Sequence, residues 1–246
     1  QLLAAQSGRD PAGRAPGDDP AALDALAESL MGDETLLAHC HALATESLVA
    51  DRLQQRHAID PVLSPLLQEL IAAEDPAVAA LAMTTLAAQS RFVQSQRRME
   101  LPLGELPAEL FHALLHRAQG RSGDTAGFAR LQAGYDEATS RLGLLARLVA
   151  GMRRGALAAL ALDHAGLALF ASSLASETRS PRGEAVLACQ EGQSVRLALL
   201  LRAAGLAVPA IERQLMLAEP AALLAPVIGA LTAARAAALL AAGRLA

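Results

Sequence analysis

Aromatic side chains are scarce in this chain of 246 residues: they make up 2% of it, with no Trp and a single Tyr, Tyr135. Hydrophobic residues nevertheless make up 53%, so we expect a core built from Leu, Ala, Val and Ile. Side chains of this size suit closely packed helices. They provide little of the aromatic surface that usually lines a ligand pocket, so the composition does not favour an enzyme or a bound cofactor.

Lysine is missing altogether, because all 21 basic side chains are Arg. We attribute this to a GC-rich coding bias rather than to mechanism. The chain also carries 25 acidic residues and a formal net charge of −4, with both signs interspersed. This balance argues against a general binder of nucleic acid or of anionic membranes, so nucleic acid is an unlikely partner.

Cysteine is almost as rare, with only Cys40 and Cys189, far apart and without a CxxC spacing. This pattern predicts no disulfide and favours the reducing cytoplasm. The longest charge-free stretches, Pro76–Ser90 and Pro220–Ala234, fall short of the roughly 20 apolar residues that span a bilayer, so we expect no membrane insertion.

What the chain does have is a repeated helix-start signal, a polar residue followed by Pro. An Asp or Ser side chain can cap the free amides of the first helical turn, and Pro at the next position loses no hydrogen bond there. The pairs are Asp19-Pro20, Asp60-Pro61, Ser64-Pro65, Asp75-Pro76, Ser180-Pro181 and Glu219-Pro220.

Apolar residues at helical spacing follow these starts, and no strand alternation is present. The sequence therefore predicts an all-α fold of stacked antiparallel helical hairpins, either HEAT-like or an irregular superhelical bundle. The expected helices are 20–31, 34–55, 65–73, 76–98, 107–119, 125–152, 156–177, 181–190, 194–204, 209–217 and 220–242, the last with a possible break at Pro226.

Composition suggests three parts. Residues 1–19 include a Gly-, Pro- and Asp-rich run and are expected to form a flexible N-terminal segment. The loop-like run QGRSGDT at 119–125 is the expected boundary between an N-terminal helical half, 20–120, and a C-terminal helical half, 121–246. The two halves could also form one continuous domain.

The run AAQSRFVQSQRRMELPLGELPAELFHALL, residues 87–115, resembles a bacterial, mostly alphaproteobacterial family known as domain of unknown function 2336. The segments IDPVLSPLLQELI, HAGLALFASSLA, RLALLLRAAGL and IERQL share the resemblance, which extends over about residues 33–242. It implies an all-helical, repeat-like fold. It implies no activity and assigns no functional residue.

Histidines offer two chemical possibilities. His112 and His116 lie one helical turn apart and could share a metal. Ala113, however, replaces the Glu of a zinc-protease motif, and no third ligand is evident. We therefore expect surface histidines and no metal. His39 and His41 flank Cys40 and point in different directions on a helix. His164 precedes small residues and could accept a phosphoryl group, although no cation is near it in sequence.

Residues 194–217 resemble a helix-turn-helix, with Gly205 at the turn and Arg213 and Gln214 on the second helix. The same helix carries Glu212, which does not suit DNA, and helix–Gly–helix corners are common in plain bundles. A bacterial signalling protein that acts through DNA binding or through His164 is therefore the alternative function.

No phosphate loop, nucleophile elbow or paired-carboxylate motif is present, so we expect a non-enzymatic protein-interaction or regulatory module. Its partner would be another protein. The expected partner-binding face combines basic residues at the end of one helix with the irregular linker that follows. It consists of Arg91, Arg97, Arg98, Glu100 and Glu105.

Overall fold

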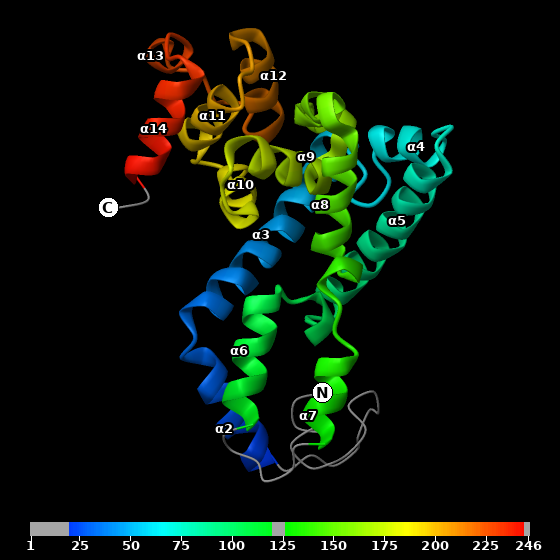
Figure 1. Ribbon diagram of the computed structural model, residues 1–246. Coiled ribbons are helices and arrows are strands. Elements are labelled where there is room, and N and C mark those ends of the chain that lie inside the picture. Colours follow the sequence, from blue (N-terminus) through cyan, green and yellow to red (C-terminus); the bar gives the residue numbers. More distant parts are fainter. Residues whose placement is uncertain (1–19, 120–125, 244–246) are drawn as a thin grey trace. The chain divides into compact units, whose positions relative to one another are not determined.

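The computed structural model describes residues 20–119 and 126–243 (Figure 1). The expected flexible segment 1–19 lies outside these residues. Within them every regular element is helical and there is no strand, which confirms the all-α fold. HEAT-like stacking stays a prediction. The α-helices are α2 (Pro20–Met31), α3 (Glu34–His57), α4 (Pro65–Ile71), α5 (Pro76–Arg97), α6 (Ala108–Gln119), α7 (Ala126–Ala133), α8 (Arg141–Met152), α9 (Leu162–Thr178), α10 (Arg182–Ala188), α11 (Ser194–Ala203), α12 (Val208–Ala218), α13 (Pro226–Gly229) and α14 (Ala233–Gly243).

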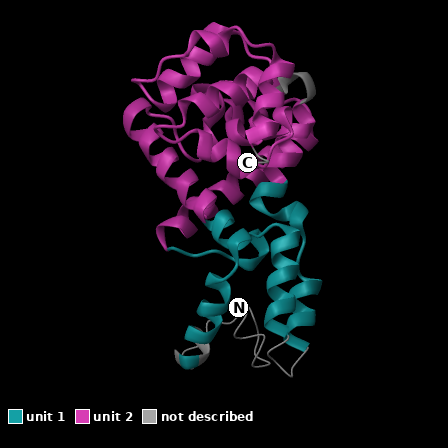
Figure 2. Ribbon diagram, turned by 90° about the vertical axis from the view of Figure 1, so that its left-hand side faces the viewer, with its two compact units in different colours: residues 1–40, 99–143 teal, residues 41–98, 144–246 magenta. Residues whose placement is uncertain are grey.

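Three short 3₁₀ helices connect some of these elements: η1 (Leu103–Glu105), η2 (Glu137–Thr139) and η3 (Arg153–Leu160). The chain divides into two compact units, each made of two separate segments (Figure 2). Unit 1 comprises residues 1–40 and 99–143, and unit 2 comprises residues 41–98 and 144–246. This division does not follow the boundary expected near residue 120, because residues on both sides of it belong to unit 1.

Unit 1 has a core that is richer in aromatic rings than the composition suggested. Phe111 and Phe128 are buried, and Phe111 stacks on Tyr135 with ring centroids 3.9 Å apart. The Tyr135 hydroxyl donates to the carbonyl of Leu106 at 2.8 Å, which satisfies its polar end. Three of the five aromatic residues thus consolidate this smaller unit.

Unit 2 is organised around α9 (Figure 1), and the side chains of this helix from Leu169 to Leu174 are all buried. Helices α4, α10, α11 and α12 pack against it, as does η3. Burial on all sides explains the continuous apolar and small-residue composition of α9, since a helix surrounded by others has no polar stripe.

Two of the Pro-linked helix starts are confirmed in their chemistry. The Ser64 hydroxyl accepts a hydrogen bond from the Leu67 amide at 3.3 Å at the start of α4. The Asp75 carboxylate accepts from the Ala77 amide at 2.8 Å at the start of α5. These caps are local, so the sequence pattern was sufficient to predict them.

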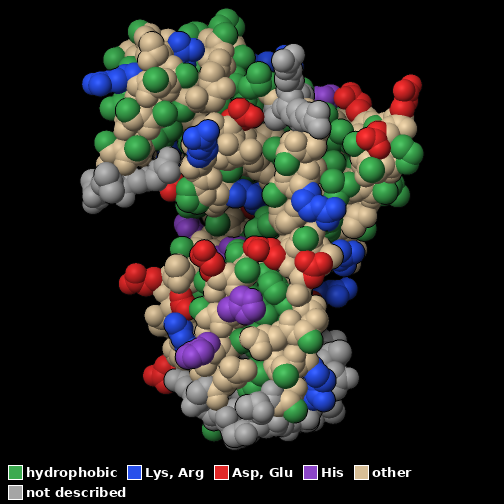
Figure 3. All heavy atoms as spheres, viewed as in Figure 1, with side chains coloured by type: hydrophobic (Ala, Val, Ile, Leu, Met, Phe, Trp, Pro, Cys, Tyr) green, Lys and Arg blue, Asp and Glu red, His purple; other side chains and the backbone are tan. Residues whose placement is uncertain are grey.

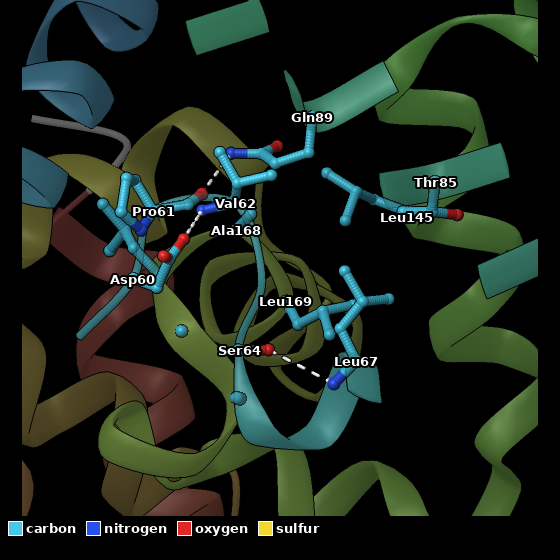
Figure 4. A pocket seen from close by; sticks show the side chains of 13 residues that line it. Asp60, Pro61, Val62, Ser64, Leu67, Thr85, Gln89, Leu145, Ala168 and Leu169 are labelled. Carbon is cyan, nitrogen blue, oxygen red and sulfur yellow. Dashed lines mark hydrogen bonds between the residues drawn. The ribbon is translucent and has the colours of Figure 1, made fainter. Parts of the chain in front are cut away.

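Two other predicted helix starts, at Asp60-Pro61 and Glu219-Pro220, are wrong because no helix begins there. Asp60 accepts from the amides of Val62 and Leu63, at 2.7 and 2.9 Å, and forms a turn rather than a helix (Figure 4). Glu219 ends α12 and is followed by irregular chain until α13 begins at Pro226. An Asp- or Glu-Pro pair marks a turn in these places, and tertiary packing decides whether a helix follows.

The long helix expected over 125–152 is also wrong, because α7 ends at Ala133 and α8 begins at Arg141. Between them Asp136 caps η2 by accepting from the Ala138 amide at 3.0 Å. Ser140 accepts from Gly143 at 3.1 Å in the first turn of α8. The intervening run GYDEATSR, residues 134–141, has no apolar period and contains these capping residues, a local signal that the prediction of one long helix did not use.

The helix expected over 156–177 begins later, at Leu162, and contains a kink at Gly166 with φ of 67° and ψ of 162°. A Cβ at this position would lie 3.0 Å from the Cβ of Ser64. Gly166 therefore permits both the left-handed backbone and the close approach of the 60–64 loop, of which Asp60, Pro61, Val62 and Ser64 are labelled in Figure 4.

Candidate functional site

The expected partner-binding face is only partly retained. Arg91, Arg97 and Arg98 are exposed and belong to unit 2, whereas Glu100 is exposed and belongs to unit 1. The structure corrects the expectation that Glu105 belongs to this face. Glu105 is half-buried, and its carboxylate accepts a hydrogen bond from the Arg141 amide at 2.7 Å. It caps the N-terminus of α8 and is not available as a docking group.

Helix α5 has two distinct faces. Its inner face is buried through Ala82, Thr85, Ala88 and Gln89, and the Gln89 amide donates to the Pro61 carbonyl at 2.9 Å (Figure 4). Its outer face is exposed and follows helical spacing along the whole helix. We call this outer face the α5 stripe; it consists of Ala80, Met83, Thr84, Ala87, Arg91, Gln94 and Arg98.

The α5 stripe changes character along the helix. Its N-terminal half carries small and apolar side chains, including Met83 with 51% of its surface exposed. Its C-terminal half carries Arg91 and Arg98, next to Arg97, and the whole helix contains no Asp or Glu. Figure 3 shows basic side chains together on the right-hand flank, over the C-terminal half of α5.

The three arginines of α5 differ from many others in the chain. Arg182 pairs with Glu46, Arg117 with Asp33, Arg196 with Glu184, and Arg52 and Arg56 with Glu191. Arg91, Arg97 and Arg98 have no ion pair with any residue in the described ranges. Their charge is partly balanced by the negative end of the α5 dipole, so the face is stable and still available to a partner.

The segment 194–217 does form two helices, α11 and α12, joined at Gly205 with φ of 91°. The polar residues expected to contact DNA are engaged inside unit 2. Arg213 pairs with the Asp163 carboxylate, and Gln214 is 2% exposed and accepts from the Leu162 amide at 2.7 Å. The other exposed side chains on α12 include Met216 and Glu212, whose negative charge the DNA phosphates repel.

His164 lies on an open groove of about 810 Å³ bounded by η3, α9 and α12. The groove has apolar walls and also receives Asp163 and Arg213. The structure thus supplies the cation that was missing near His164 in sequence, but Arg213 is paired with Asp163. His164 Nε2 faces the Glu69 carboxylate at 3.4 Å, an arrangement that repels an incoming phosphoryl group.

The remaining histidines and cysteines do not form a site. His112 and His116 are exposed on α6, and the described residues contain no group of three or more His, Cys, Asp and Glu side chains placed to hold a metal. Burial raises the pKa of the Cys189 thiol to about 12. Burial also raises the pKa of Cys40, so neither thiol is activated as a nucleophile.

The enclosed space beside the α9 kink is too small for an organic ligand. Asp60, Ser64 and Gly166 line a cavity of about 20 Å³, and Gln89 closes it from α5 (Figure 4). This volume holds about one water molecule. We interpret the cavity as a packing defect at the kink.

No family model matches the chain, and neither a curated protein nor a solved structure matches it. The resemblance to domain of unknown function 2336 therefore stays a prediction. None of the helices formed by residues 20–119 and 126–243 combines the length and the apolar character needed to cross a membrane. On geometry alone, the α5 stripe is the strongest candidate for a functional site.

The stripe was only half predicted. Its arginines were identified from sequence, but its apolar half, Ala80, Met83 and Ala87, was assigned no function. The outward positions recur every three or four residues, so helical spacing alone identifies this face.

Proposed function

We propose that the protein is a non-enzymatic protein-interaction module that binds an acidic amphipathic helix of another protein along the α5 stripe. The observation that carries this proposal is an exposed helix face with Ala80, Met83 and Ala87 at one end and arginine as its only charged residue type at the other. An apolar stripe of this kind accepts the apolar face of a partner helix. The arginines select a partner with acidic side chains and speed its association.

The dimensions support a modest affinity. From Ala80 to Arg98 the stripe extends over about 27 Å, at about 1.5 Å per residue, which accommodates about five turns of a partner helix. A single helix face buries less surface than the roughly 800 Å² per partner of a standard interface, so we expect a transient complex. Exposed ion pairs are weak individually, and the complex should weaken as salt increases.

The test compares three forms of the full chain as bait in nuclease-treated lysate of the native host. The first is the wild type. The second is Arg91→Glu with Arg98→Glu. The third, a matched control, is Arg179→Glu with Arg235→Glu, two exposed arginines of unit 2 away from α5. All three are followed by quantitative mass spectrometry and then by calorimetry with the recovered protein.

We expect a protein that is retained by the wild type and the control, lost with the α5 variant, and released by moderate salt. Equal recovery with all three baits would contradict the proposal. Recovery of nucleic acid alone from untreated lysate, lost in the same α5 variant, would favour the DNA-binding alternative instead.

A further inference from the structure

Helix α2 has the chemistry that the α5 stripe is proposed to bind. Its inner face sends Leu26 and Leu30 toward the core of unit 1. Its only charged residues, Asp24 and Glu28, are acidic and exposed. Met31 lies on the same outer face as Asp24 and Glu28, with 66% of its surface exposed.

The outer face of α2 follows helical spacing through Ala21, Asp24, Ala25, Glu28 and Met31. We call it the α2 stripe. Asp24 and Glu28 have no ion pair with any side chain that the structure describes, so their charge is available. The stripe is thus small, acidic and apolar, whereas the α5 stripe is small, apolar and basic.

We infer that the α2 stripe of one copy binds the α5 stripe of a second copy, an inference that rests on the function proposed above for α5. Every copy carries both stripes, so any two copies can associate through the α2 stripe of one and the α5 stripe of the other. A contact between one pair of helix faces buries less surface than a standard interface, so we expect the association to be weak.

The positions of the charges select an antiparallel arrangement. With Glu28 beside Arg91, the rise of about 1.5 Å per residue places Asp24 about 6 Å further along, between Gln94 and Arg98. It places Met31 about 4.5 Å in the other direction, next to Ala87. Every charged residue of the α2 stripe then meets a basic or amide group, and Met31 meets the apolar half of the α5 stripe.

A parallel arrangement can pair the charges, with Asp24 beside Arg91 and Glu28 between Gln94 and Arg98, but it then places Met31 beside Arg98 and away from the apolar half of the α5 stripe. If Glu28 lies beside Arg98, Met31 extends beyond the end of α5 and the apolar half of the stripe receives no apolar side chain. Antiparallel helices also align their dipoles favourably, which adds to the preference.

The first measurement is the mass of the full chain by sedimentation equilibrium between about 1 and 300 µM, at low and high salt. A mass that rises from 25.4 kDa towards twice that value at low salt, and returns to 25.4 kDa at high salt, is the expected result. A mass that stays at 25.4 kDa throughout would overturn the inference.

A charge swap tests the pairing itself. Variant A carries Arg91→Glu and Arg98→Glu, and variant B carries Asp24→Arg and Glu28→Arg. Each alone should dissociate at least about tenfold more readily than the wild type. A mixture of A and B should dimerise again, because the acidic α2 of A meets the basic α5 of B, and the reversed pair is complementary as well.

Two further results distinguish self-association from an altered stability of the monomer. A single chain with all four substitutions should dimerise, whereas the Arg179→Glu with Arg235→Glu control should behave as the wild type. If the swap changed only the unfolding free energy of a monomer, the contact would be within one chain and the inference would be wrong. Circular dichroism of each variant verifies its helical content.

The experiment also distinguishes this inference from the proposed function. Variant B loses its own α2 contact but keeps an unaltered α5 stripe, so its capture of a host partner should increase relative to the wild type. If variant B captures a host partner and the wild type forms no dimer, the inferred self-association is wrong and the proposed function is retained. If no form captures a host partner but the wild type forms a salt-dependent dimer, the proposed function is wrong and the self-association is retained.

Discussion

Arg182 and Glu46 form a two-bonded ion pair in the interior of unit 2, with N–O distances of 2.7 and 2.6 Å. Glu46 is 1% exposed, and Arg182 also donates to the Ser172 hydroxyl at 2.9 Å. The pair links α3, α9 and α10, and its geometry satisfies the planar guanidinium on both sides. It is a buried ion pair in a core that is mostly apolar.

Removing one partner should therefore leave a buried charge without compensation. We expect Glu46→Gln to lower the free energy of unfolding by about 3–5 kcal/mol, measured by urea denaturation. Replacing both residues with apolar ones, Glu46→Leu with Arg182→Met, should recover much of the loss because no buried charge remains. Arg56→Ala, which breaks the exposed pair with Glu191, is the control and should change stability little. A double variant no more stable than Glu46→Gln would argue that the charges themselves stabilise the core.

The position of this pair explains the limit of sequence-based prediction in the chain. Helix α5 and its Asp75 cap were predicted correctly because the cap, the Pro and the apolar spacing are adjacent in sequence. Glu46 and Arg182 are 136 positions apart, and no sequence pattern near either residue predicts that they pair.

Besides the local caps at Asp136 and Ser140, the start of α8 depends on a contact that is distant in sequence. The Arg141 amide is satisfied by Glu105, which is 36 residues away, so the new helix start depends on tertiary structure. Because its carboxylate is engaged in this contact, Glu105 is not available as part of the expected partner-binding face. Arg91, Arg97 and Arg98 are exposed, because a long charged side chain near a helix end seldom becomes buried, and their role in binding a partner stays a prediction.

Gly166 should tolerate substitution poorly. Gly166→Ala places a side chain at a φ of 67° and brings its Cβ to 3.0 Å from the Ser64 Cβ, so we expect a loss of about 1–3 kcal/mol in thermal or urea unfolding. Gly151→Ala is the matched control, because a Cβ there meets no atom within 4 Å and the residue is helical. It should be neutral or slightly stabilising. Equal effects of the two substitutions would contradict the role assigned to the kink.

Asp33 should make unit 1 sensitive to acid. The hydroxyl of Thr35 and the amide of Leu36 donate to its carboxylate, and with Arg117 nearby they hold the pKa of Asp33 below its ordinary value of 3.8. A lowered pKa in the folded state means that the ionised group adds stability fully above 3.8, and that this stability is lost as the pH falls through the folded value.

The measurement is the titration of the Asp33 carboxyl carbon by NMR together with unfolding at several pH values. Asp33→Asn should be less stable near neutral pH and should lose this part of the acid dependence. Asp24→Asn, an exposed carboxylate on α2, serves as the comparison and should leave the acid dependence unchanged. A folded-state pKa at or above 3.8 would contradict the assigned cap.

Gln214 and Arg213 are neighbours on α12 with different expected effects on stability, and together they test the DNA-binding alternative. The Gln214 side chain supplies the acceptor for the buried Leu162 amide, so Gln214→Leu should leave that amide unsatisfied and lower the free energy of unfolding by about 1–3 kcal/mol. Arg213→Ala removes only an exposed ion pair with Asp163 and should change stability little. Both are measured by urea denaturation, with a DNA mobility-shift assay of the wild type and of Arg213→Ala alongside. A shift by the wild type that Arg213→Ala abolishes would mean that the Arg213–Asp163 pair opens to contact DNA, because an arginine held by a carboxylate in solution contributes no phosphate contact.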